Sequence, residues 1–257
     1  MSVSPELKSA VVDYCQRLGD DNLILGSRLS ELCGHGPELE EDIALTNIAL
    51  DCIGVAQLFL ELAGETEGQG RSADQLAYWR DDTEFKNCLL VEQPNGDFAI
   101  TIARQFLFDA VMVPLYDELA KSKFTPLAEV AAKALKEAKY HLRHSMQWVI
   151  RLGDGTEESN RRIQAAFDSL WTYTAELFLL DDVEKQLVEA GFVPDRSKLE
   201  SAWSKRVAEV FAEAGIKIPS EETFMAHSSR TGRHSEHLGY MLAEMQLLAR
   251  SHPGATW

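Results

Sequence analysis

The segment Glu41–Gly64, EDIALTNIALDCIGVAQLFLELAG, carries the clearest structural signal in the chain. Its apolar residues recur at alternating spacings of three and four, which is the period of one face of an α-helix. The residues of this stripe are Leu45, Ile48, Cys52, Val55, Phe59 and Leu62. The pattern predicts a long amphipathic helix that ends at Gly64. Asp51 lies on the same stripe, so the helix would carry one acid toward a core.

Helical periodicity continues over nearly the whole chain, and no segment alternates convincingly with the two-residue period of a strand. Three other core helices are expected. The first covers residues 20–36, with an aspartate cap and closing glycines at 34 and 36. The second begins at Asp97, and the third covers about residues 126–152. Ser72 would cap a short helix in a connection. Later helices are expected over 156–178, 181–191, 197–215 and 227–251. The sequence predicts one all-α domain over residues 1–257, with a four-helix core and additional C-terminal helices.

Composition excludes several classes of function. The chain has 257 residues, and 41 acidic against 25 basic residues give a formal net charge of −16. Such a surface would repel nucleic acid and anionic lipid, although it could attract a basic protein partner. The four cysteines form no C-x-x-C motif, there is no secretory signal, and the apolar run FLFDAVMVPLY is too short to span a bilayer. We expect a soluble cytoplasmic protein with reduced thiols.

Polar residues inside the apolar stripes are the candidate site. Glu31, Asp51, Asp109 and His141 come from four predicted helices, as the ligands of a di-metal site in a helical bundle do. Such a site needs two histidines and about four carboxylates, and each histidine follows a glutamate by three residues. The position three after Asp51 is Gly54, and the position three before His141 is Ala138, so two ligands are missing. The sequence therefore predicts a lost metal site and no metal in this chain.

The polar residues of this candidate site allow two other interpretations: a substitute ligand from a neighbouring position, or buried ion pairs. Glu137 precedes His141 by four residues, and a shift of one residue rotates a side chain by about 100° around the helix axis, so it cannot replace Ala138. Alternatively, the inward acids form ordinary buried ion pairs; the cations on the same helices are Arg28, Arg104, Lys139 and Arg143.

The segment HSEH offers a weaker metal site. It would place His234 and His237 one turn apart, with Glu244 as a third zinc ligand two turns further on.

Four blocks of sequence resemble the PaaC family of bacterial phenylacetyl-CoA epoxidase subunits over nearly the whole chain. They are residues 20–54, DDNLILGSRLSELCGHGPELEEDIALTNIALDCIG, residues 89–110, LLVEQPNGDFAITIARQFLFDA, residues 134–159, ALKEAKYHLRHSMQWVIRLGDGTEES, and residues 236–257, EHLGYMLAEMQLLARSHPGATW. The resemblance implies a ferritin-like fold and a structural, non-catalytic role beside PaaA, the subunit that carries the di-iron centre. It also implies that Asp51 and His141 occupy former ligand positions.

The resemblance further implies a place in aerobic phenylacetate catabolism. The complex would epoxidise the ring of phenylacetyl-CoA with O₂ and with NADPH used through a reductase, PaaE, and PaaB is a further possible partner. Phenylacetyl-CoA would be bound mainly by PaaA. Two rival interpretations stay open: an active di-iron oxidase that uses Glu31, Asp51, Asp109, Glu137 and His141, and a helical scaffold or storage protein without an enzyme partner.

Overall fold

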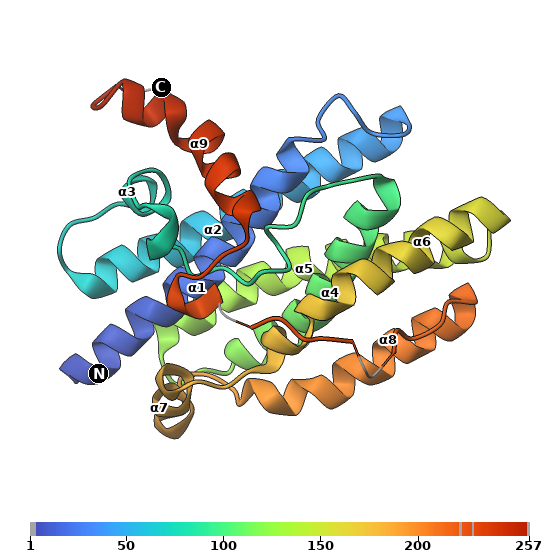
Figure 1. Ribbon diagram of the computed structural model, residues 1–257. Helices are drawn as coiled ribbons and strands as arrows, with labels where there is room; N and C mark the ends of the chain where they lie inside the picture. The colour runs from blue at the N-terminus through green and yellow to red at the C-terminus, as the bar shows by residue number, and fades with distance from the viewer. Residues whose placement is uncertain (1–3, 221–222, 228, 256–257) are drawn as a thin grey trace.

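Four long helices form the body of the protein (Figure 1). The computed structural model describes residues 4–220, 223–227 and 229–255. The long helices are α1 (Pro5–Ser30), α2 (Leu39–Glu67), α4 (Phe98–Leu119) and α5 (Thr125–Gly153). Helix α1 packs along α2, α4 packs along α5, and α2 joins the two pairs through α5. This is the predicted four-helix core.

Shorter helices surround this core. They are α3 (Ala73–Tyr78), α6 (Glu157–Leu170), α7 (Asp182–Ala190), α8 (Glu200–Ala214) and α9 (Glu236–Ser251), with 3₁₀ turns at Asp82–Glu84, Trp171–Tyr173, Ala175–Phe178, Arg196–Leu199 and Ser229–Thr231. Helices α6 and α8 pack on α4 and α5, and α7 packs on α1. Helix α9 contacts α3 and points away from the body (Figure 1). No strand occurs in the described ranges, so the predicted all-α bundle with additional C-terminal helices is confirmed.

Helix α1 is longer than predicted. It begins at Pro5, where the Ser4 hydroxyl accepts a hydrogen bond from the Leu7 N–H, and ends at Ser30. The aspartates that were expected to cap a helix at residue 20 lie in its middle, and both Asp20 and Asp21 are fully buried. The prediction was wrong because consecutive acids resemble a cap in sequence, whereas here cations from other segments neutralise them.

Helix α2 also continues past its predicted end. Gly64 does not stop the helix; the last helical residue is Glu67, and Gly68 follows with a left-handed φ of 73°. Gly64 is required for a different reason. A Cβ atom at this position would lie 2.1 Å from the Arg71 carbonyl oxygen, so the returning chain could not pass so close to a larger residue.

The remaining helix boundaries largely follow the sequence. Asp97 caps α4 by accepting a hydrogen bond from the Ile100 N–H at 3.1 Å, and Ser72 caps α3 as predicted. Helix α5 matches the predicted fourth core helix within about one residue. Two predicted helices are shorter in the structure: α6 ends at Leu170 and continues as 3₁₀ turns, and α9 begins only at Glu236. Part of the predicted 227–251 helix, residue 228, lies outside the described residues.

Two of the core helices are apolar enough to resemble membrane spans. By length and composition α2 and α4 could each cross a bilayer, although 78% of the apolar window of α4 and 44% of that of α2 are buried in the bundle. The run FLFDAVMVPLY, which was expected to be too short to span a bilayer, lies inside α4, a helix of 22 residues. Burial explains its composition, because a helix surrounded by protein can carry apolar residues on every face. Three cysteines are buried and Cys33 is exposed, all as free thiols.

Candidate functional site

Asp109 is the central buried acid of the site. It lies on α4, is 2% exposed, and accepts hydrogen bonds from Gln105 Nε2 at 2.8 Å and Ser145 Oγ at 3.2 Å. Burial raises the pKa of Asp109 from its ordinary 3.8 to about 7, although nearby His141 lowers it. The Asp109 carboxyl group thus accepts hydrogen bonds from two uncharged side chains and does not depend on a cation as its partner.

Asp51 and His141 link α2 to α5 beside this acid. The Asp51 carboxylate lies 3.1 Å from His141 Nε2. The His141 side chain is buried, whereas the Asp51 side chain retains 34% of its exposure, so Asp51 lies at the edge of the site rather than inside it. Asp51 therefore has a hydrogen-bonding partner on another helix, and that partner is His141 rather than one of the expected arginines or lysines.

Helix α1 contributes Asn22 to this site, not Glu31. Asn22 is buried and, together with Asp109 and His141, lines a small cavity between the core helices; its Nδ2 donates to Tyr116 Oη at 2.9 Å. Glu31 follows the last turn of α1 and pairs at 2.8 Å with Arg28. The inward placement of Glu31 was therefore wrong. Because α1 ends at Ser30, Glu31 is its exposed C-cap residue, whereas Asn22 lies further back in the helix and is buried.

The cations considered as partners of the inward acids have other roles. Arg104 is fully buried and donates to the Gln93 carbonyl, and its pKa falls to about 9 because of burial. Lys139 and Arg143 are exposed on α5. Neither Asp51 nor Asp109 forms an ion pair with an arginine or lysine in the described ranges.

The residues present do not fit a metal centre. Gly54 has no side chain and Ala138 has only a methyl group, so neither position offers a ligand atom. Glu137 is exposed at the rim of a cavity of about 10 Å³, which is at most about the space of one water molecule. Within the described part of the chain, no group of three or more His, Cys, Asp or Glu side chains is arranged to hold a metal ion. The hypothesis that these positions once held iron stays a prediction.

Comparison with known proteins identifies the family. The profile of the family described as phenylacetic acid catabolic protein (PaaA_PaaC) matches residues 2–257. The chain belongs to this family. It is also 50% identical over 247 residues to the C subunit of the 1,2-phenylacetyl-CoA epoxidase of Escherichia coli (strain K12), with 95% of this chain and 98% of that protein covered. Membership of the PaaA_PaaC family agrees with the ferritin-like bundle that the resemblance implied.

In this PaaA_PaaC family member, the HSEH segment anchors the chain before α9. His234 lies outside the helix, and its ring nitrogens contact the Glu92 carboxylate at 2.9 Å and the Phe85 carbonyl at 3.0 Å. The Glu92 contact raises the pKa of His234 although burial opposes this rise. His234 and His237 are not one turn apart on a helix, and the described residues hold no third ligand beside them. The predicted spacing for zinc is therefore wrong.

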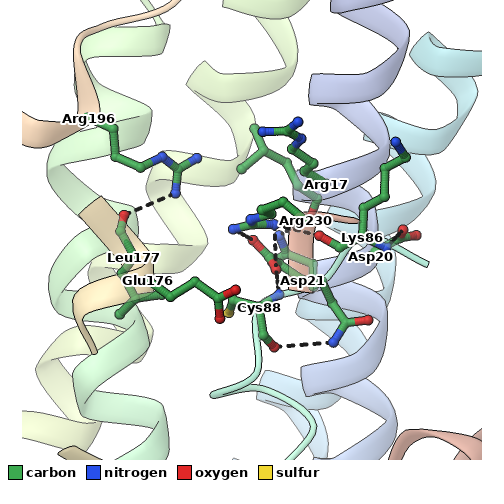
Figure 2. Close-up of polar contacts among 12 residues, drawn as sticks. Arg17, Asp20, Asp21, Lys86, Cys88, Glu176, Leu177, Arg196 and Arg230 are labelled. Atoms are coloured by element: carbon green, nitrogen blue, oxygen red, sulfur yellow. Dashed lines mark hydrogen bonds and ion pairs between the residues drawn. The ribbon is translucent and has the colours of Figure 1, made fainter. Parts of the chain in front are cut away.

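The same C-terminal segment is tied to α1 by a buried charge cluster that sequence analysis missed (Figure 2). Arg230 Nη2 lies 3.0 Å from the fully buried Asp21, which also accepts the Cys88 N–H at 2.7 Å. Arg80 pairs with Asp20 one residue earlier. The Asp21 carboxylate raises the pKa of Arg230 above its usual range although burial opposes this. The adjacent acids on α1 were the only sequence signal, and their partners lie 60 and 209 residues away.

Proposed function

We propose that this chain is a non-catalytic structural subunit of a multicomponent phenylacetyl-CoA 1,2-epoxidase and that it pairs with the di-iron catalytic subunit PaaA. The observation that carries the proposal is the state of the polar site. A di-iron bundle needs ligands that converge on the metal. In this chain Asp51 contacts His141, Asp109 accepts hydrogen bonds from uncharged donors, and Ala138 stands where a ligand would be needed. The 50% identity to the C subunit of a known epoxidase supports membership of such a complex.

A helical bundle without a metal can still act as a structural subunit. It keeps long helices whose outer faces can stabilise a partner, and in the assembled complex it would help to shape the entrance for the CoA thioester and could dock the reductase PaaE. PaaB is a further candidate partner. NADPH and O₂ would be consumed at the level of the complex, with the di-iron centre in PaaA. We place this assembly in the cytoplasm, without nucleic-acid or membrane contacts.

Co-expression with PaaA tests the proposal. Size exclusion with mass measurement should show a hetero-oligomer of the two chains, and the mixture with its reductase should epoxidise phenylacetyl-CoA while this chain alone does not. Full turnover by PaaA and reductase without this chain would contradict a structural role. The absence of any complex would favour the scaffold alternative, and two irons in this chain would favour an active di-iron oxidase.

A further inference from the structure

The C-terminal part of the chain forms an arm beside the four-helix body. We call residues 230–251 the arm; it consists of the segment before α9 and of α9 itself, which points away from the body (Figure 1). Helix α9 packs on α3 and on the turn Asp82–Glu84. All 16 residues of α9 are described, and the buried ones are Leu238, Met241, Leu242 and Gln246. Because this apolar contact is small, polar contacts matter for holding the arm in place.

Two polar anchors of the arm keep their charge as pH changes around neutrality. Near the far end, Gln246 Nε2 donates hydrogen bonds to the Ala77 and Arg80 carbonyls at 3.1 and 3.0 Å. At the start of the arm, the Arg230 guanidinium lies 3.0 Å from the Asp21 carboxylate. An amide does not titrate and an arginine stays protonated, so these donors persist at alkaline pH.

The third anchor, His234, differs because it is a buried imidazole. Its side chain is 5% exposed; Nδ1 lies 2.9 Å from Glu92 Oε2, and Nε2 lies 3.0 Å from the Phe85 carbonyl oxygen. Both of these oxygens are hydrogen-bond acceptors. A neutral imidazole carries a single N–H, so one of its nitrogens would turn a lone pair toward an oxygen. The contacts therefore fit an imidazolium, which donates from both nitrogens.

The other contacts of Glu92 fit an ionised carboxylate. Glu92 is fully buried, its Oε1 accepts the Ser235 N–H at 2.6 Å, and its Oε2 accepts Asn87 Nδ2 at 3.1 Å. Each partner of this carboxylate is thus a donor, as an ionised side chain requires. Ser235 is the N-cap residue of α9, so the His234–Glu92 pair lies where the arm becomes helical.

Charged and titratable groups from several elements surround this pair. On α1, Arg28 donates to the Glu92 carbonyl at 2.9 Å and to the His237 carbonyl at 3.2 Å. Asp20, also on α1, pairs with Arg80, and Tyr173 on the turn Trp171–Tyr173 lies within the field of Glu92. Burial lowers the pKa of His234, but the Glu92 carboxylate, the Phe85 carbonyl and Asp20 together raise it above its ordinary value.

We propose that the His234–Glu92 pair is a proton-dependent latch: the protonated histidine holds the first turns of α9 against the bundle, and loss of its proton lets them separate. This inference concerns the chain alone and does not depend on the proposed function. The folded-state pKa of His234 is raised above 6.5, so the latch is fully closed below pH 6.5 and is lost as pH rises through the raised pKa.

The separation should stay local. Gln246, Arg230 and Arg28 hold the arm through donors that do not titrate in this range, so they limit the movement to the residues between them. The side chains that would gain exposure are Leu238, Met241 and Leu242 on the inner face of α9. The latch would therefore control access to an apolar face without unfolding the bundle.

Amide hydrogen exchange of the full chain from pH 6 to pH 9 tests the latch. After correction for the intrinsic exchange rate, protection of residues 236–242 is divided by that of α4, which reports on the bundle. We expect this ratio to fall by about tenfold or more as pH rises, the size of effect that follows the loss of a hydrogen bond to a charged group. A constant ratio across this range would overturn the proposal.

Two variants and a control assign the effect to this pair. His234→Gln should show reduced protection of residues 236–242 already at pH 6 and no further pH dependence. Glu92→Gln removes the charge that keeps His234 protonated, so it should move the midpoint of the fall to lower pH by about one unit or more. His252→Gln changes an exposed imidazole at the other end of α9 and should behave like the wild type. An unmoved midpoint in Glu92→Gln, or a lost pH dependence in His252→Gln, would overturn the latch.

Nitrogen NMR of the wild-type chain with labelled histidines tests the geometry without any substitution, so a variant that fails to fold does not decide the outcome. At pH 6 both ring nitrogens of His234 should carry protons, and the titration of this ring should coincide with the fall in protection of residues 236–242. A neutral His234 at pH 6, or a titration that leaves the protection unchanged, would overturn the proposal.

Discussion

His141 on α5 and Asp51 on α2 lie 3.1 Å apart and connect the two halves of the four-helix core. His141 is buried, whereas one third of the Asp51 side chain is exposed. Solvent therefore screens one member of the pair. The cost of about 3–5 kcal/mol that follows truncation of a buried pair would overestimate the effect of removing Asp51.

We expect Asp51→Ala to lower the free energy of unfolding by about 1 kcal/mol, because a partly exposed hydrogen bond is lost. Urea denaturation of the isolated chain measures this change. Asn47→Ala, at an exposed position one turn earlier on α2, is the matched control and should have almost no effect. A loss of about 3 kcal/mol or more would show that the pair behaves as a fully buried one.

Asp109 should make stability depend on pH. Its pKa is about 7 in the folded chain and 3.8 ordinarily, so between these values the folded chain holds a proton that the unfolded chain releases. The free energy of unfolding should therefore fall as pH rises through this window. Asp109→Asn should remove much of that fall, measured by denaturation from pH 4 to pH 8. Asp117→Asn, which changes an acid near the end of the same helix that pairs with Lys121, should not. An unchanged slope in Asp109→Asn would contradict the assignment.

The buried charge cluster should contribute strongly to stability. Asp21→Ala leaves Arg230, whose side chain is only 13% exposed, without its buried carboxylate partner, so we expect a loss of about 3 kcal/mol. Limited proteolysis should then cleave the segment before α9 faster than in the wild type, because that segment is tied to α1 through Arg230. Glu158→Ala removes an exposed partner of Arg161 and should change neither measurement. Equal effects of the two substitutions would show that burial does not matter here.

Two glycines on α2 should respond to alanine in opposite ways. Gly64→Ala would place a Cβ atom 2.1 Å from the Arg71 carbonyl oxygen, so the variant should melt at a lower temperature. Gly54→Ala meets no atom within 4 Å and should raise the free energy of unfolding by about 0.5–1 kcal/mol through helix propensity. Thermal melting of both variants is the measurement, and a stabilised Gly64→Ala would contradict the described approach of the chain.

The purified chain should contain no stoichiometric iron. Gly54 and Ala138 supply no donor atoms, and Asp109 already accepts two hydrogen bonds. Metal analysis after expression in iron-supplemented medium, with co-expressed PaaA as the positive control, measures this directly. About two irons per chain, with the absorption of an oxo-bridged pair, would restore the rival hypothesis of an active oxidase.

The sequence by itself determined the helical class and the core helices. Apolar stripes with spacings of three and four located α2, α4 and α5, and the caps Ser72 and Asp97 are found where local side-chain chemistry predicts them. The same register indicated that Asp51 and His141 point toward one site and that Gly54 and Ala138 leave it incomplete. The helices and caps were predicted correctly because each depends only on residues within one or two helical turns, whereas the loss of a metal site at Gly54 and Ala138 stays a prediction.

Only the tertiary structure decided which residues meet. Asp20 and Asp21 look like a helix cap in sequence, but Arg80 and Arg230 from distant segments neutralise them and allow α1 to continue. That longer helix brings Asn22 rather than Glu31 to the polar site. Burial and long-range pairing set the energy of a charged side chain, and neither quantity can be read from the residues beside it in the chain.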